Sequence, residues 1–205
     1  VAEVILTYEH DPNNPVETVG GGNLIIQTPQ NDRVSAGPMN YADPNFASFT
    51  MDRPDVLKFE TDFIQDSLSI VGVPTAKIFA STSPLSGPSG VTDTDFFIRI
   101  LDVYPNGEEF FVVEGAVNAR ARDYAKQLAN GIEDVNIPYT NINENDVYEY
   151  EFRLLPIAYT FGHNHKLKVL ISSSNWPRYQ SNANVPVNDG DFFRRSPNDG
   201  LEYTY

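Results

Sequence analysis

The stretch DFFIRILDVYPNGEEFFVVEG, residues 95–115, decides the fold class of this chain. Residues 95–103 and 108–115 are rich in Phe, Val and Ile, which favour β-strands. Between them lies YPNG, whose Asn106-Gly107 pair is the dipeptide most typical of a tight hairpin, because both turn positions there need positive φ. The stretch therefore predicts two antiparallel strands, and the more apolar first strand is expected near the middle of a sheet.

Other strand-like runs recur along the chain, whereas helical periodicity is nearly absent. The clearest run is VYEYEFRL, residues 147–154. Its apolar side chains occupy every second position: Tyr148, Tyr150, Phe152 and Leu154. This alternation predicts a strand with one buried face and one face in water. Further strands are predicted for residues 55–61, 75–81 and 166–172.

One helix is expected, in residues 119–130, with Asn118 as its N-cap and Gly131 as the residue that ends it. The 15 prolines and 13 glycines separate the strands and lie in long loops. About eight antiparallel strands with at most one short helix predict an all-β fold, a jelly-roll β-sandwich of two packed sheets. We expect residues 1–205 to form this single domain, and the abrupt start in a strand-like run suggests a part of a longer protein.

The composition excludes several classes of function. Asp and Glu number 28 against 14 Lys and Arg, so the formal net charge is −14. This charge repels phosphate backbones and anionic lipids, so we expect a soluble protein with no nucleic-acid and no membrane partner. The absence of cysteine excludes disulfides, thiolate metal sites and cysteine nucleophiles. The compartment, cytoplasmic or exported, and the oligomeric state stay open, because cysteine-free proteins occur in both places.

Residues 162–186, GHNHKLKVLISSSNWPRYQSNANVP, contain two of the three histidines, the only tryptophan and a run of three serines. A serine hydrolase of the α/β type would need a G-x-S-x-G elbow, and the chain has none. Serines that follow a strand more often bond loop backbone than attack a substrate. We therefore expect no catalytic residue and no enzyme activity of the chain on its own.

Two pairs of residues have a spacing that a metal ion could use. His163 and His165 lie two apart at a strand entry and would project from one face. Asp93 and Asp95 are spaced alike, and calcium could use them with loop carbonyls. We favour a surface turn for the histidines, a solvated strand start for the carboxylates and a turn for His10, so no metal or cofactor is predicted.

Trp176 and Arg178, in the segment NWPRY, are the candidate binding residues. If exposed, they would form a sugar platform or a cation–π pair. If buried, Trp176 would instead anchor its loop, and this second interpretation is the one that we favour.

Four blocks resemble, in the same order, the C-terminal domain of X-Pro dipeptidyl-peptidases and cocaine-esterase-like (CocE/NonD) hydrolases. The blocks are YEHDPNNPVETVGGGNL (8–24), RPDVLKFETDFIQDSLSIVGVPTAKIFASTS (53–83), DTDFFIRILDVYPNGEEFFVVEGAVNARAR (93–122) and GHNHKLKVLISSSNWPRYQSNAN (162–184). Three features depart from the family: Trp176 stands where many members have Phe, the tract 123–146 differs, and the chain stops where members continue into a last strand.

The resemblance implies a jelly roll similar to galactose-binding folds that carries no triad residue. The Ser–Asp–His triad would lie on an upstream α/β-hydrolase domain, and this domain would pack on it and shape the rim of its acyl pocket. The contact would use an apolar patch, with loops 81–91 and 175–184, and hence Trp176 and Arg178, near the rim. The parent would be an X-Pro dipeptidyl-peptidase or an acyl esterase. A carbohydrate-binding module is the alternative, because fold alone does not fix function.

Overall fold

The structure is a computed structural model, and it describes residues 5–22, 25–27, 33–35, 40–44, 46, 50–83, 91–133 and 136–184. Among the elements whose bounds it gives, α2 is the only α-helix, and all paired strands are antiparallel. In this part of the chain, no helix is long and apolar enough to cross a bilayer. The predicted all-β sandwich is confirmed.

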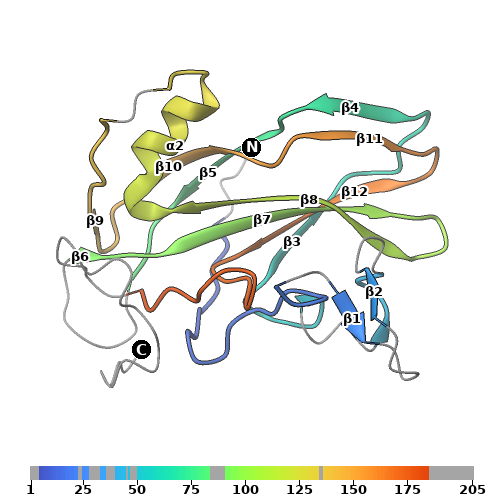
Figure 1. The fold of residues 1–205 in the computed structure, drawn as a ribbon, viewed down its shortest axis with the longest axis horizontal. Coiled ribbons are helices and arrows are strands. Elements are labelled where there is room, and N and C mark those ends of the chain that lie inside the picture. The colour runs from blue at the N-terminus through green and yellow to red at the C-terminus, as the bar shows by residue number, and fades with distance from the viewer. Residues whose placement is uncertain are drawn as a thin grey trace.

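One layer of the sandwich is a four-stranded sheet (Figure 1). Its order is β3 (Leu57–Glu60), β12 (Lys166–Ser172), β7 (Asp95–Val103) and β8 (Glu109–Asn118). The predicted hairpin between β7 and β8 is present, but its loop is longer than a two-residue turn. The amide of Tyr104 bonds the carbonyl of Glu108 at 2.8 Å, and within the loop Gly107 has positive φ, +88°, whereas Asn106 does not. Asn106 instead accepts a hydrogen bond from the Glu108 amide at 3.1 Å.

The second layer is a long two-stranded ribbon. Its strands are β4 (Leu68–Gly72) and β5 (Thr75–Ala80) on one side, and β10 (Tyr148–Arg153) and β11 (Ile157–Phe161) on the other. β5 pairs with β10 and β4 pairs with β11, and each side is interrupted once, at Pro74 and at Pro156. The two pairs follow one another along the top of the molecule (Figure 1).

The ribbon meets the four-stranded sheet where it is interrupted. The amide of Leu155 donates to the carbonyl of Glu114 in β8 at 3.0 Å. A Cβ atom on Gly115 would lie 2.9 Å from the carbonyl oxygen of Arg153 and from Cα of Leu154. Only glycine therefore allows this close approach of two backbones.

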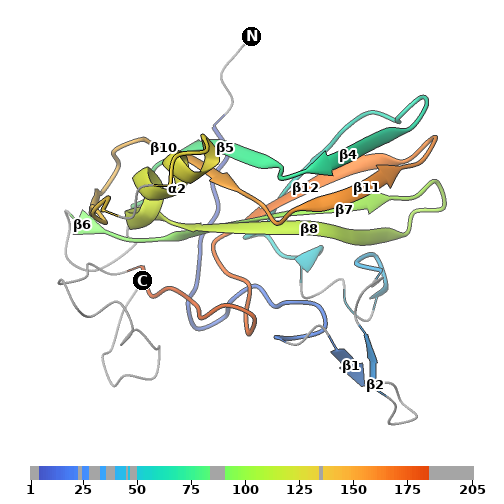
Figure 2. The same ribbon diagram turned by 45° about the horizontal axis from the view of Figure 1, so that its top comes forward.

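Apolar side chains fill the space between the two layers. Tyr150, Phe152 and Leu154 of the predicted strand 147–154 are buried there, whereas Val147 is 68% exposed, so the predicted alternation is confirmed. The helix α2 (Arg122–Ala129) lies against β10 at one end of the ribbon (Figure 2). It follows the 3-10 turn η1 (Ala119–Ala121), which Asn118 caps as predicted.

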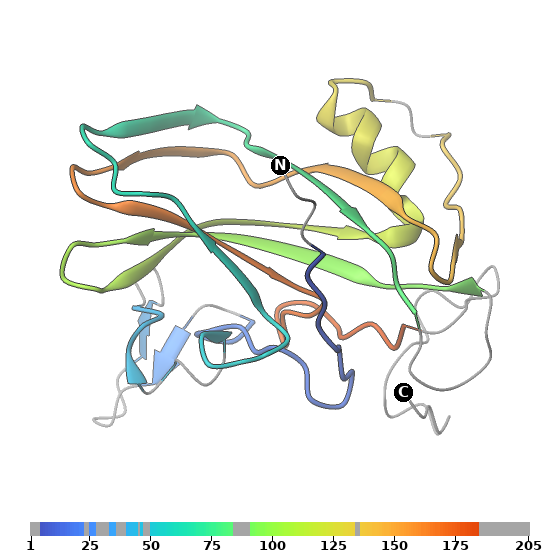
Figure 3. The same ribbon diagram turned by 180° about the vertical axis from the view of Figure 1, so that it is seen from behind.

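The other face of the four-stranded sheet is covered by two irregular segments, residues 5–22 and 173–184 (Figure 3). They lie side by side, and a second core forms between this cover and the sheet. It contains Val16, Val19, Tyr41, Val56, Leu101 and Leu170. The remaining strands are two short pairs: β1 (Ile25–Gln27) with β2 (Arg33–Ser35), and β6 (Val91–Thr92) with β9 (Ile142–Asn143). The four-stranded sheet is therefore covered on both faces.

Candidate functional site

The loop 175–179 presents the candidate residue Trp176. The Trp176 amide donates to the carbonyl of Val16 at 2.9 Å, and the Thr18 amide donates to the carbonyl of Trp176 at 2.5 Å. The peptide bond between Trp176 and Pro177 is cis. Both backbone groups of Trp176 are thus held by the neighbouring segment, while the residue as a whole is 45% exposed. The expectation of a buried tryptophan is wrong: its backbone anchors the loop, but the residue is exposed.

Arg178, in the same loop, is bound to the sheet through its side chain. Its Nε atom is 2.6 Å from Oε1 of Glu114, a residue of β8 that is 4% exposed. Asn175 Nδ2 donates to the other oxygen of the same carboxylate at 2.9 Å. Within the described contacts, the cation–π pairs involve other residues. Arg178 therefore compensates a buried charge and fixes the loop, and it is not stacked on Trp176.

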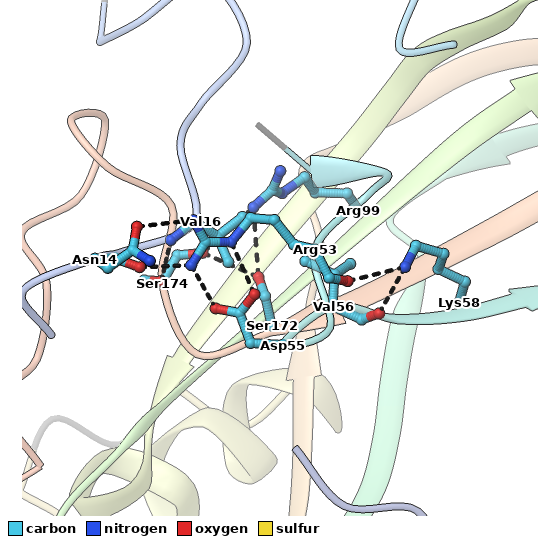
Figure 4. Close-up of polar contacts among 9 residues, drawn as sticks. All are labelled: Asn14, Val16, Arg53, Asp55, Val56, Lys58, Arg99, Ser172 and Ser174. Carbon is cyan, nitrogen blue, oxygen red and sulfur yellow. Dashed lines mark hydrogen bonds and ion pairs between the residues drawn. The ribbon is translucent and has the colours of Figure 1, made fainter. Parts of the chain in front are cut away.

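A second guanidinium lies deeper under the same cover. Arg99 of β7 is 1% exposed, and its Nη2 atom donates to Ser172 Oγ at 3.4 Å and to the Ser174 carbonyl at 3.3 Å (Figure 4). Burial lowers the pKa of Arg99, while Tyr41 and Glu114 act to raise it. Arg99 and Glu114 are also directly opposite each other in the β7–β8 register. Glu114 thus lies between two guanidinium groups, and this network supports the loop from below.

The three serines bond loop backbone and one tyrosine. Ser172 Oγ donates to the Ser174 carbonyl at 2.9 Å, and Ser174 Oγ accepts from the Val16 amide at 2.8 Å. Ser173 Oγ pairs with the Tyr8 hydroxyl at 2.8 Å, and burial raises the pKa of Tyr8 to about 12. The predicted bonding of the serines to loop backbone is confirmed for two of them.

Arg53 ties the first covering segment to the entry of β3 (Figure 4). It forms two hydrogen bonds of 2.8 Å with the two carboxylate oxygens of Asp55. Its Nη1 atom also donates to Oδ1 of Asn14 at 3.2 Å. A bidentate pair of this kind has fixed geometry, so it holds residues 14–16, and with them the backbone partner of Trp176.

The histidines lie apart from one another. His163 is exposed and contacts the Gln65 carbonyl through Nδ1, whereas His165 Nδ1 is 2.8 Å from Asp102 Oδ1, a buried carboxylate that also accepts from Tyr159. Asn164, between them, has φ of 60°, so the predicted turn is present but the shared face is wrong.

His10 is partly buried, and its Nε2 atom lies 3.1 Å from the Asn182 carbonyl. It comes directly before the turn of residues 11–14 and does not lie in it, so the expectation of a turn residue is wrong by one position. Burial lowers its pKa. In the described ranges, no histidine is hydrogen-bonded to a serine, and no three His, Cys, Asp or Glu side chains group as a metal site.

Asp93 is buried and Asp95 is partly buried, which corrects the expectation of a solvated strand start. Asp93 is completely buried, and both carboxylates accept hydrogen bonds from the side-chain amides of Asn118 and Asn182 at 2.7–3.2 Å. These bonds join the N-cap of η1 and the segment after Trp176 to the start of β7. The pair therefore fastens the end of the second covering segment.

Sequence reasoning missed the partners of Arg178 and Arg99. Glu114 is distant in sequence from residues 175–178, so no local pattern connects them. One signal was available: Arg99 and Glu114 are charged residues flanked by apolar residues in their strands, and a hairpin register would have placed them opposite each other. Of the proposed rim loops, residues 84–90 lie outside the described part of the chain.

These features define a class of protein: an all-β sandwich whose serines, histidines and buried charges bond to other groups of the same domain. The comparisons with known proteins agree. The sequence pattern described as "X-Pro dipeptidyl-peptidase C-terminal non-catalytic domain" matches residues 6–199. The chain belongs to this family of domains, found in hydrolases of the CocE/NonD type.

Three relatives indicate the context of the domain. The cocaine esterase of Rhodococcus sp. (strain MB1 Bresler) is 30% identical over 179 residues, which are 87% of this chain and 26% of that protein. An alpha-amino acid ester hydrolase matches with a TM-score of 0.54 at 24% identity, over 92% of this chain and 28% of that one. An aminopeptidase from a marine sediment Thaumarchaeota archaeon also gives 0.54 at 24% identity, over 74% and 26%. The last two show a shared fold, and this chain spans about a quarter of each relative's length.

Proposed function

We propose that this domain is the non-catalytic partner of an α/β-hydrolase catalytic domain in one polypeptide, and that the loop 175–179 lies at their contact. The exposed, rigidly held Trp176 is the observation on which this rests. Large aromatic side chains at fixed positions dominate many protein contacts, because they bury much apolar area at little entropic cost.

The network beneath the loop supports the same role. Because Glu114 holds both Arg178 and Asn175, the loop does not need to be ordered when a partner binds. Pre-ordering lowers the cost of association, and a catalytic domain would gain a fixed wall beside its substrate pocket. The domain would thus shape the acyl pocket without supplying a nucleophile or base.

For the parent protein we propose a serine hydrolase that acts on esters or on X-Pro peptides. The support is the family description together with the esterase among the relatives. Trp176 also suits a carbohydrate-binding module, since an exposed indole can stack on a sugar. Arg178, the neighbouring polar candidate, already forms an ion pair with Glu114. It is therefore less available to donate hydrogen bonds to a sugar, which disfavours this alternative.

The test compares two exposed aromatic residues in the polypeptide that contains the catalytic domain. Trp176→Ala should lower the melting temperature of the catalytic domain and raise KM for an activated ester. Phe79→Ala is the matched control, because Phe79 is 67% exposed on the opposite layer. Equal behaviour of the two variants would contradict the proposal, and glycan binding that Trp176→Ala abolishes would favour the alternative.

A further inference from the structure

The first covering segment, residues 5–22, is fastened unevenly to the rest of the sandwich. Residues 14–18 are held by backbone hydrogen bonds to Trp176 and by Arg53, whose Nη1 atom donates to Asn14. For residues 5–13, none of the described backbone hydrogen bonds reaches another segment. Segments with few bonds open locally at the least cost, so this end of the cover can open while the sandwich stays folded.

Two side-chain contacts hold residues 5–13 against the second covering segment. The Tyr8 hydroxyl pairs with Ser173 Oγ at 2.8 Å, and His10 Nε2 lies 3.1 Å from the carbonyl oxygen of Asn182. Burial raises the pKa of Tyr8 to about 12, so this hydroxyl stays neutral at ordinary pH. A histidine, by contrast, changes its charge between about pH 5 and about pH 8. The His10 contact is therefore the one of the two that responds to acid.

The position of His10 fits the neutral imidazole ring. Asn182 is itself fixed, because its Nδ2 atom donates to Asp93 and Asp95 at 3.0 and 3.1 Å. Its carbonyl can only accept, so Nε2 of His10 carries the ring proton and Nδ1 has a lone pair. Nδ1 is shielded from water and has no hydrogen-bond partner in the described part of the chain. A proton on Nδ1 would therefore leave a buried donor without an acceptor.

The charges around His10 do not offset this cost. Burial is the largest influence on the ring, and it lowers the pKa of His10. The Asn182 carbonyl and the carboxylates of Asp55 and Asp11 act the other way, while Arg53 adds to the effect of burial. Both oxygens of Asp55 already accept from Arg53 at 2.8 Å, and Asp11 is exposed, so water screens its charge.

We propose that His10 is an acid-sensitive latch between the two covering segments: when Nδ1 takes up a proton, residues 5–13 detach from residues 180–184. In the detached state the charged ring reaches water. The opening ends at Asn14, because Arg53 holds that residue and Val16 stays in the second core. The closed state is favoured at about pH 7.5, and the open state gains as the pH falls below about 6.5.

The latch itself does not depend on the proposed function, but that function gives it a consequence. In a polypeptide whose catalytic domain precedes this one, residues 5–13 lie in the connection between the two domains. Acid would then free these residues and lengthen the connection, so that the two domains are held together less closely. Only this consequence rests on the proposed function.

Hydroxyl-radical oxidation of Tyr8, in the polypeptide that contains the catalytic domain, tests the latch. Tyr8 is partly buried in the closed cover, whereas Tyr139 is 57% exposed and serves as the reference in the same sample. Relative to Tyr139, Tyr8 should be oxidised about threefold faster, or more, at about pH 5.5 than at about pH 7.5. His10→Gln keeps a neutral donor for the Asn182 carbonyl, and it should abolish this acid response.

His163→Gln is the matched control, since His163 is exposed in the turn before β12, and it should keep the wild-type response. Oxidation of Tyr8 that is independent of pH in wild type would overturn the proposal. A response that persists in His10→Gln would also overturn it, because another group would then be the sensor.

Tyr150, which is completely buried between the two layers, distinguishes local opening from unfolding. It should stay protected at both pH values, and a rise equal to that of Tyr8 would mean that the whole sandwich unfolds and that there is no latch. Docking of the loop 175–179 is judged separately, from the protection of Trp176 at about pH 7.5. The latch and the proposed function can therefore fail independently.

Discussion

At the scale of single residues, Gly115 shows most directly how packing selects a side chain. Gly115→Ala should lower the free energy of unfolding by between about 1 and 3 kcal/mol, because the new methyl group would meet rigid backbone at 2.9 Å. Urea unfolding measures the change. Gly22→Ala is the control: its Cβ would first meet an atom, the Pro177 oxygen, at 3.5 Å, an ordinary contact. Equal stability of the two variants would show that the ribbon does not cross β8 this closely.

His10 gives a prediction about pH. Burial lowers its pKa below the ordinary value of about 6.5, so on acidification the unfolded chain takes up a proton before the folded chain does. Stability is therefore present at about pH 7.5 and falls as the pH drops through 6.5 toward the lower, folded pKa. The loss of unfolding free energy between about pH 7.5 and about pH 5.5 should be smaller in His10→Gln than in wild type.

His163→Gln provides the control for this comparison, because His163 is exposed in the turn before β12. It should show the same acid-dependent loss of stability as wild type. An unchanged pH dependence in His10→Gln would mean that His10 is protonated equally in the folded and unfolded states.

At the scale of elements, the sequence predicted most of the long strands, including β5 and β10 of the ribbon, but missed its other two strands. Residues 95–103 and 166–172 match β7 and β12, because strict alternation or a long apolar run marks a strand with a buried face. β4 and β11 were missed. In LSIVG the apolar residues at 70 and 71 are adjacent, and only one of them faces the core, so no alternation is visible. Such strands are defined by their pairing with a strand that is distant in the sequence, and the local pattern of apolar residues does not reveal them.

The N-cap of η1 gives a prediction about an element. Asn118 accepts from the Arg120 amide at 3.1 Å and also donates to Asp93 and Asp95. Asn118→Ala should therefore cost more than a cap alone, about 2–3 kcal/mol of unfolding free energy, since it leaves a buried carboxylate short of a partner. Chemical denaturation provides the measurement.

The other end of the helix supplies the matched variant. Asn130 is exposed, and its side chain donates to the Lys126 carbonyl at 2.7 Å. Asn130→Ala should cost no more than about 1 kcal/mol. A loss in Asn118→Ala no larger than this would contradict the role of Asn118 in joining the helix to β7.

At the scale of the whole molecule, the cover over the four-stranded sheet is what local patterns could not reveal. Residues 5–22 and 173–184 come from opposite ends of the described chain, yet they lie side by side, and Arg99 is buried on the sheet beneath them. A charged residue in a strand ordinarily predicts a wet face, so the hairpin register could have paired Arg99 with Glu114, but the burial of Arg99 was not predictable without the tertiary contacts. The same cover presents Trp176, which explains why its exposure was predicted wrongly.

Oxidative footprinting of Trp176 tests the central claim most directly. The measurement compares the oxidation rate of this side chain in the 205-residue chain and in the polypeptide that contains the catalytic domain. If the domain docks through the loop 175–179, Trp176 should be oxidised readily in the chain alone, as its 45% exposure requires, and be protected in the longer polypeptide. Equal oxidation of Trp176 in both would contradict the account.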